Sequence, residues 1–231
     1  MPPTWKMPEN SLIACSHKPS MPTIEEARKF YPPSDGVHGF DHVERVYHMA
    51  EKIGKAEGAD LEILRASALL HDVEGSTPGK KERSSHHEQS ANFAATVLHK
   101  EGWTDARIKA VQHCIRAHRY RDTDEAPQSL EAKCLFDADK LDVLGAIGVA
   151  RTIAYAVMAG TPHYKEPSDQ FIKTGKEVPG ELHSAYHEFL FKLIKVKDRL
   201  FTKTAKTIAI QRHQFLVQYF EQLKAEMHGE K

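Results

Sequence analysis

The chain has 231 residues, of which 40% are hydrophobic and 28% charged, a length and balance that allow one domain with a sizeable core. Lysine plus arginine equals aspartate plus glutamate, at 32 each, and this neutrality argues against a surface for DNA or RNA polymers, which needs a basic excess. No apolar run approaches the roughly 18 residues that span a bilayer, and the proline-rich N-terminus lacks the apolar stretch of a signal peptide. The three cysteines show no paired spacing for disulfides or zinc. We therefore expect a cytoplasmic protein that acts on a small molecule and not on a membrane.

Apolar residues recur at steps of three and four along almost the whole chain, which predicts an all-α fold. We expect a poorly ordered lead-in over residues 1–22 and one helical domain over residues 23–231. Within this domain, a core over about 38–145 should be followed by a helical extension over 146–231. The expected helices cover about 23–31, 41–57, 60–73, 84–101, 104–120, 129–159, 181–196 and 203–227.

Capping residues and glycines indicate where several of these helices begin, end or bend. Thr23 and Asp60 are good N-caps for the first and third helices. Gly145 and Gly148 mark a break or a close helix contact inside the long sixth segment. The stretch over about 160–180 contains prolines and glycines and predicts a long surface loop.

Residues with metal-binding side chains stand on apolar helical stripes, where they should face the core. His42 shares a face with apolar residues of the second helix, and His71 ends the stripe of the third, directly before Asp72. Asp139 and Asp142 lie on one stripe of the sixth segment. The apolar members of these stripes are Val46, Met49, Ile53, Leu61, Leu64, Ala68, Leu135 and Ala146. A carboxylate that faces a core costs several kcal/mol unless it is paired or bound to a metal.

Each of these residues taken alone has a simpler explanation, because charged groups usually bend toward solvent or cap helix ends. Two imidazoles and two carboxylates together can instead converge inside a bundle. The set His42, His71, Asp72 and Asp139 suits one divalent ion of Mn, Ni, Co, Fe, Mg or Zn. In an octahedral shell it leaves room for water and a substrate oxygen. Such an ion can polarise a phosphoryl oxygen and lower the pKa of a bound water.

The segments around these residues resemble the HD superfamily of metal-dependent phosphohydrolases. They are HGFDHVERV over 38–46, LHDV over 70–73 and DADKLD over 137–142. In that family the histidine of the H-x-x-R-V segment, the His-Asp pair and the later aspartate bind the metal. The resemblance therefore implies ligand roles for the same four residues. It extends from about residue 24 to the C-terminus and points to a bacterial and archaeal subgroup, some of whose members cleave nucleoside triphosphates or related phosphates.

The sequence does not decide the roles of several other histidines near these motifs. His38 competes with His42 as a ligand, although neighbouring glycines place His38 in the entry turn. His118 ends a stripe in the fifth helix and His87 stands on one in the fourth, with His86 on the adjacent face. His87 and His118 could contact substrate phosphate, hold a second metal as two such histidines do in some HD relatives, or be hydrogen-bonded core residues.

Charged residues near the metal motif are candidates for substrate binding or for proton transfer. Lys80, Lys81 and Arg83 follow the motif by a short loop and could neutralise phosphate charge, as could Lys140. The first two lysines could equally belong to a solvated charged run. Glu74 could act as a base on metal-bound water or be an exposed residue at a helix end.

These features predict a divalent-metal phosphohydrolase whose substrate is a small phosphorylated molecule of the nucleotide class. The candidate catalytic residues are Asp72, Glu74 and His118, and the candidate substrate-binding residues are Arg83, Lys80, Lys81, Lys140 and His87. One alternative is a di-iron oxygenase of the HD type, which needs His87 and His118 as two further ligands. Another is a non-catalytic, metal-stabilised module that binds a nucleotide. The amphipathic last helix could pack on its own chain or on a second copy in a homodimer.

Overall fold

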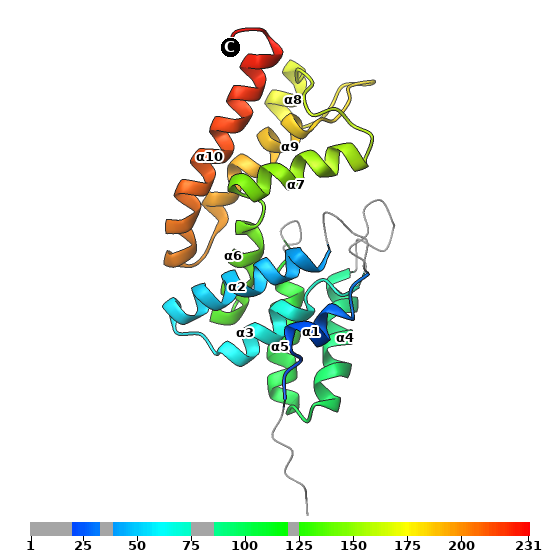
Figure 1. Ribbon diagram of the computed structural model, residues 1–231, viewed down its shortest axis with the longest axis vertical. Coiled ribbons are helices and arrows are strands. Elements are labelled where there is room, and N and C mark those ends of the chain that lie inside the picture. The colour runs from blue at the N-terminus through cyan, green and yellow to red at the C-terminus, as the bar shows by residue number, and fades with distance from the viewer. Residues whose placement is uncertain (1–19, 33–38, 75–85, 120–124) are drawn as a thin grey trace, which may run out of the picture.

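The computed structural model describes residues 20–32, 39–74, 86–119 and 125–231. Over these residues the protein is helical and contains no strand, which confirms the all-α prediction. Most of the expected lead-in lies outside the described residues. Figure 1 shows a lower and an upper group of helices, joined by α6 (Leu130–Leu141). In the described part of the chain no single helix is long and apolar enough to cross a bilayer, although α6 and the helix after it would pass as a bent pair.

The lower group contains the N-terminal helices, which begin close to their predicted positions. They are α1 (Ile24–Arg28), α2 (Phe40–Glu57), α3 (Leu61–Leu70), α4 (His86–Lys100) and α5 (Asp105–Ala117). Thr23 caps α1 in a capping box with Glu26, and Asp60 accepts two backbone hydrogen bonds at the start of α3. The prediction carried the third helix too far, because α3 ends at Leu70 and His71 takes the C-cap position.

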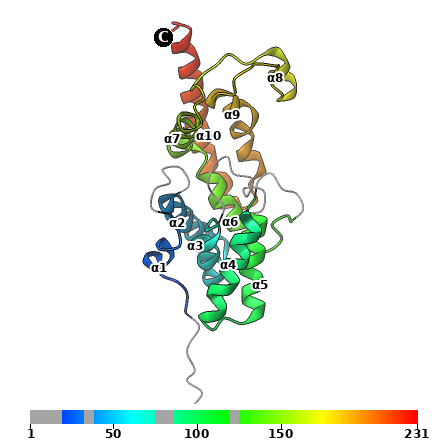
Figure 2. The same cartoon turned by 90° about the vertical axis from the view of Figure 1, so that its right-hand side faces the viewer.

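The upper group contains the C-terminal helices, and in Figures 1 and 2 the last of them runs along the whole group. They are α7 (Gly145–Met158), α8 (Asp169–Thr174), α9 (Ala185–Phe191), the 3-10 helix η2 (Leu193–Arg199) and α10 (Lys203–Met227). Two predictions need correction. The stretch 160–180 is not all loop, because Ser168 caps the short helix α8 and Gly175 ends it. The helix expected over 181–196 starts later and changes to 3-10 geometry after Lys192.

A bend of 66° separates α6 from α7. Gly145 begins α7 with φ at 70°, in the left-handed region that favours glycine. A Cβ on Gly148 would come within 2.3 Å of the carbonyl atoms of Val143. The two glycines therefore mark both a break and a close contact. The bend places Asp139 and Asp142 at the end of α6 that leads into the upper group.

Buried apolar residues connect the two groups. One cluster combines Val46 of α2 and Leu135 of α6 with Phe189 of α9 and Phe220 of α10. A second cluster lies within the lower group and includes Leu69 of α3. Burial of apolar surface stabilises a fold by roughly 25 cal/mol per Å². The first cluster therefore holds the upper helices against α6, the helix that leads to Asp139 and Asp142.

Candidate metal centre

The four predicted ligands lie together where α2, the end of α3 and α6 meet. His42 Nε2 lies 3.4 Å from Asp139 Oδ1 and 4.0 Å from Asp72 Oδ2. His71 Nε2 lies 3.8 Å from Asp72 Oδ2. Both imidazoles are buried, and ligand atoms of His42, His71 and Asp72 fall within 4.8 Å of one another. These three side chains could hold a metal ion, with Asp139 beside them.

Hydrogen bonds on the far side of each ring fix which nitrogen faces this cluster. His42 Nδ1 lies 2.7 Å from Asp142 Oδ2, and His71 Nδ1 lies 2.8 Å from the carbonyl oxygen of Ala68. Since a carboxylate or a carbonyl only accepts, Nδ1 of each neutral ring carries the proton and Nε2 presents a lone pair. His71 Nε2 is buried without a hydrogen-bond partner in the described structure. A buried polar atom of this kind usually indicates an ion or a water that completes the site.

The carboxylates of Asp72 and Asp139 face these lone pairs. Asp72 Oδ1 is also buried without a hydrogen-bond partner among the described residues. An imidazole lone pair and a carboxylate oxygen repel each other at the 3.4 Å that separates His42 from Asp139, unless a proton or a cation lies near both. Two nitrogens and two carboxylates form a donor set that borderline and hard divalent ions accept. The residues therefore fit a divalent metal ion.

Burial and neighbouring charge set the protonation of the cluster. Burial lowers the pKa of His71 to about 4, so its ring is neutral near pH 7, the form that binds a metal. Burial alone would raise the pKa of Asp72, but His71 and His118 outweigh it and hold this pKa well below its usual range. The pKa of Asp139 is likewise held well below its usual range, because Lys140 and His42 outweigh the effect of burial.

Asp142 fixes the orientation of His42. Besides the bond to His42, its carboxylate accepts hydrogen bonds from Arg45 at 2.8 and 3.1 Å and from Arg151 Nη1 at 2.7 Å. Burial raises the pKa of Asp142, yet His42 and Arg45 lower it overall. The H-x-x-R spacing thus lets two side chains of α2 reach one carboxylate, which holds the ring of His42 in place.

Comparison with known proteins identifies the family. The HD domain family model matches residues 39–144. YpgQ of Bacillus subtilis (strain 168), described as uncharacterized, is 33% identical over 196 residues, which cover 83% of this chain and 85% of YpgQ. This chain belongs to the HD superfamily.

Solved structures agree with this HD assignment. The crystal structure of YpgQ in complex with ADP is 29% identical, with a TM-score of 0.65 and coverage of 88% of this chain and 94% of that chain. An HD-superfamily hydrolase from Bacillus thuringiensis is 28% identical, with a TM-score of 0.64 and coverage of 89% and 96%. A Lactobacillus plantarum protein is 26% identical, with a TM-score of 0.70 and coverage of 89% and 95%. The resemblance to HD hydrolases is thereby confirmed.

A second group of possible ligands in this HD protein shares Asp72. His86 Nε2 lies 3.6 Å and His118 Nε2 lies 3.4 Å from Asp72 Oδ1, and the three ligand atoms fall within 4.8 Å of one another. His118 Nδ1 donates to the carbonyl oxygen of Ile115, so its Nε2 also presents a lone pair. The carboxylate of Asp72 therefore has imidazoles on both of its sides.

His86 is the member of this group that the sequence pattern ranked too low. The pattern favoured His87, which stands on the stripe with Ala91, whereas the structure brings the ring of His86 to Asp72. His86 also begins a step of four to Ser90 and Ala94, and both of these residues are buried. That spacing allows an inward orientation for His86 as well, so the sequence offered two adjacent stripes for this helix.

The other candidate residues have different positions. Lys140 forms an ion pair with Asp139 and lies 5.2 Å from the ring of Phe136. Glu74 is exposed, and its backbone N–H donates to Ser90 Oγ at 3.1 Å. His87 follows His86 at the start of α4. The candidates that lie outside the described residues are His38, Lys80, Lys81 and Arg83.

Proposed function

We propose that this HD protein is a divalent-metal-dependent phosphohydrolase that acts on a small phosphorylated substrate of the nucleotide class. His42, His71, Asp72 and Asp139 would hold the ion. The observation that carries the proposal is the set of Nε2 lone pairs that converge on the carboxylates of Asp72 and Asp139, with His71 Nε2 and Asp72 Oδ1 buried and without hydrogen-bond partners among the described residues. A divalent cation removes both the repulsion and the unsatisfied buried atoms.

The bound ion would supply a Lewis acid for a phosphoryl oxygen and a water of lowered pKa. The chain's own residues would bind and move protons around it. Asp142 holds His42 in the binding tautomer, and Lys140 offsets part of the charge of Asp139. His118 presents Nε2 at the opposite side of Asp72, where it can exchange a proton with the attacking water or the leaving group.

The nucleotide class of the substrate is proposed from chemistry and from likeness. Phosphate oxygens suit a hard divalent ion, and the YpgQ relative has been solved in complex with ADP. Within the proposal, Lys80, Lys81 and Arg83 are phosphate-binding residues contributed from outside the described structure. His87 remains a proposed substrate contact, and Glu74 remains a proposed base.

The decisive experiment measures release of phosphate or pyrophosphate from a panel of nucleotides. The protein is first stripped of metal and then supplied with single divalent ions. We expect turnover only with metal, and its loss by at least about 1,000-fold in Asp139→Ala, because a directly bound carboxylate is removed. Asp105→Asn is the matched control, since that carboxylate is 82% exposed on α5. Full activity in Asp139→Ala would refute the ligand assignment.

One observation favours a second candidate function. Asp72 belongs to two groups of possible ligands, as a carboxylate that bridges two ions would. This arrangement fits a di-iron oxygenase of the HD type, with His86 and His118 as the additional ligands. Metal content and oxygen uptake separate the candidates. Two irons per chain with oxygen consumption would support the oxygenase, whereas phosphate release with one or two divalent ions supports the hydrolase.

A further inference from the structure

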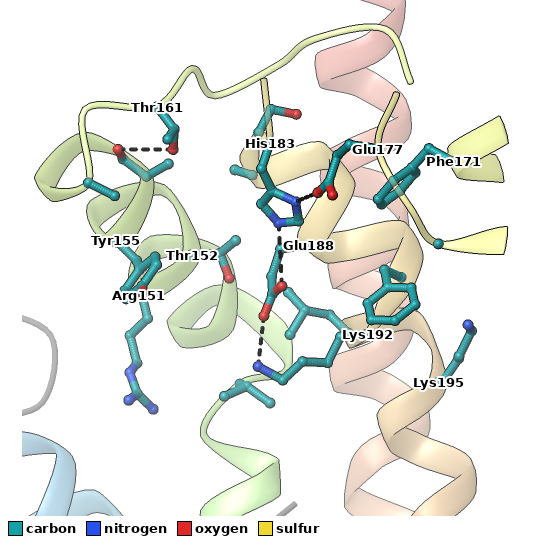
Figure 3. Close-up of a pocket in the computed structure, with 18 of the residues that line it drawn as sticks. Arg151, Thr152, Tyr155, Thr161, Phe171, Glu177, His183, Glu188, Lys192 and Lys195 are labelled. Atoms are coloured by element: carbon teal, nitrogen blue, oxygen red, sulfur yellow. Dashed lines mark hydrogen bonds and ion pairs between the residues drawn. The ribbon is translucent and has the colours of Figure 1, made fainter. Parts of the chain in front are cut away.

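A cavity of about 800 Å³ lies in the upper group of helices, between α7, α8, α9 and η2. Figure 3 shows Tyr155 and Arg151 on one side of it, Phe171 and Lys195 on the other, and Glu188 between them. Its volume is within the range of about 300–1,000 Å³ that small-molecule sites occupy. The cavity is therefore large enough for the organic part of a nucleotide.

The walls of the cavity combine aromatic rings with polar groups. The rings are those of Tyr155, Phe171 and Phe191. Between them, Glu188 pairs with Lys192 at 2.7 Å and with His183 at 3.6 Å, as Figure 3 shows. The cavity has the mixture of flat apolar surface and oriented polar atoms that recognises a heterocycle.

Basic side chains outnumber acidic ones in the lining of the cavity. Four of the lining residues are arginine or lysine and two are glutamate, namely Arg151, Lys192, Lys195 and Arg199 against Glu177 and Glu188. Hydrogen bonds to Glu188 and Glu177 also raise the pKa of His183. A molecule with an aromatic ring at one end and phosphates at the other matches these walls.

Arg151 connects the cavity to the metal centre. It lines the cavity, and its Nη1 lies 2.7 Å from Asp142 Oδ2. The same oxygen atom accepts the hydrogen bond from Nδ1 of His42. The guanidinium and the proposed metal ligand thus touch one carboxylate oxygen, and in Figure 3 the side chain of Arg151 points away from Thr161 and His183. Arg151 therefore joins the wall of the cavity to the carboxylate that positions His42.

We propose that this cavity binds the base and sugar of a nucleotide whose phosphates extend past Arg151 to the metal centre. The inference rests on the proposed hydrolase function and adds the part of the site that selects the substrate. The aromatic side chains bind the faces of the base, and Glu188 with His183 selects among its edge groups. Oriented polar groups of this kind discriminate strongly, because a wrong substrate leaves them unpaired.

The test fills the cavity from an exposed position. Ala159 lines the cavity at the end of α7 and is exposed, so Ala159→Trp adds an indole there without disturbing the core. Val157→Trp is the matched control, because Val157 is 61% exposed near the end of the same helix and is absent from the lining. Two quantities are measured on the metal-loaded full chain: the Kd of ADP by calorimetry, and kcat/KM for a nucleoside triphosphate relative to inorganic tripolyphosphate.

We expect Ala159→Trp to weaken ADP binding at least about tenfold and to lower the ratio of the two kcat/KM values by a similar factor, because only the nucleotide has an organic end. Val157→Trp should change neither quantity. Equal ADP affinity in Ala159→Trp and the unmodified protein would overturn the inference. It would also be overturned if no protein in the set bound ADP, while metal-dependent hydrolysis of tripolyphosphate would still support the hydrolase. If nothing is hydrolysed but ADP binding shows the expected loss, the cavity assignment holds and the hydrolase proposal fails.

Discussion

Replacing Asp142 with Asn tests whether the metal centre depends on a residue that does not bind the metal in our proposal. The carboxylate of Asp142 receives hydrogen bonds from His42, Arg45 and Arg151 at 2.7 to 3.1 Å. An amide of nearly the same shape offers one acceptor oxygen, and its NH2 group must face at least one of these donors. The substitution also removes the carboxylate charge that Arg45 and Arg151 share next to His42, although Arg45 keeps its ion pair with Asp41 at 3.1 Å. The orientation and the tautomer of His42 should therefore be less well defined.

The magnitude follows from what such supporting contacts contribute in metal sites. Loss of the partner of a ligating histidine typically costs about 10- to 100-fold in metal affinity or activity. Because Asp142 holds one imidazole and two guanidinium groups at once, we expect the upper end, about 100-fold, or roughly 2.7 kcal/mol. Chelator competition gives the affinity for Mn²⁺, and thermal unfolding shows whether the variant is folded.

The control for this variant is Asp105→Asn, which removes an exposed carboxylate from α5. It should bind Mn²⁺ with unchanged affinity, and Asp139→Ala should lose most of its binding. If Asp142→Asn is folded and binds Mn²⁺ as tightly as the unmodified protein, then Asp142 does not position His42 and the reasoning fails.

Two further predictions concern the upper helices. Asp137 is fully buried and accepts hydrogen bonds from the backbone of Phe201 and from the backbone and hydroxyl of Thr202 at 2.7 to 2.9 Å. Asp137→Ala should therefore lower the free energy of unfolding, measured by urea titration, by roughly 3 kcal/mol. A loss below about 0.5 kcal/mol would contradict this prediction. The pKa of His183 is raised by its hydrogen bonds, first of all to Glu188, so the stabilising ion pair is present below about pH 6.5 and is lost as the pH rises through the raised value. NMR titration should give His183 a midpoint above that of an ordinary histidine, and this midpoint should fall in Glu188→Gln. An unshifted midpoint would show that the ion pair between His183 and Glu188 does not form. Because His183 is partly exposed, the pair should stabilise the fold by less than about 1 kcal/mol.

One periodicity predicted both the helices and the inward faces on which His42, His71 and Asp139 lie. A polar residue on an apolar stripe must face the core wherever the helix packs, so the inward direction of His42 and Asp139 needed no tertiary information. Turning a carboxylate toward the core is energetically unfavourable unless a cation or a hydrogen-bonding partner lies beside it, so the pattern indicated such a group near Asp139. The combination of two imidazoles and two carboxylates suggested that they converge, and the resemblance to the HD family implied the same four ligands.

Features that depend on packing between distant segments could not be predicted in this way. Helix α8 is too short for a periodic pattern, and only Ser168 and Gly175 marked its ends. The choice between His86 and His87 depends on how α4 is rotated against α3, which two adjacent stripes leave open. The link from Asp142 to Arg151 crosses the 66° bend after α6, and no local pattern specifies how a bend aims the next helix.

The contacts around Asp139 explain why the C-terminal helices belong to the site and not only to the core. Two residues before it, Asp137 is held by the backbone that leads into α10. Two residues after it, the carbonyl oxygen of Leu141 accepts a hydrogen bond from Arg212 of α10 at 2.7 Å. The last turn of α6 is thus fixed on both sides by α10, and Arg151 of α7 fixes Asp142 in the same turn. The family match ends at residue 144, so Arg151 and Arg212 of the upper helices lie beyond the matched segment and yet hold its last turn in place.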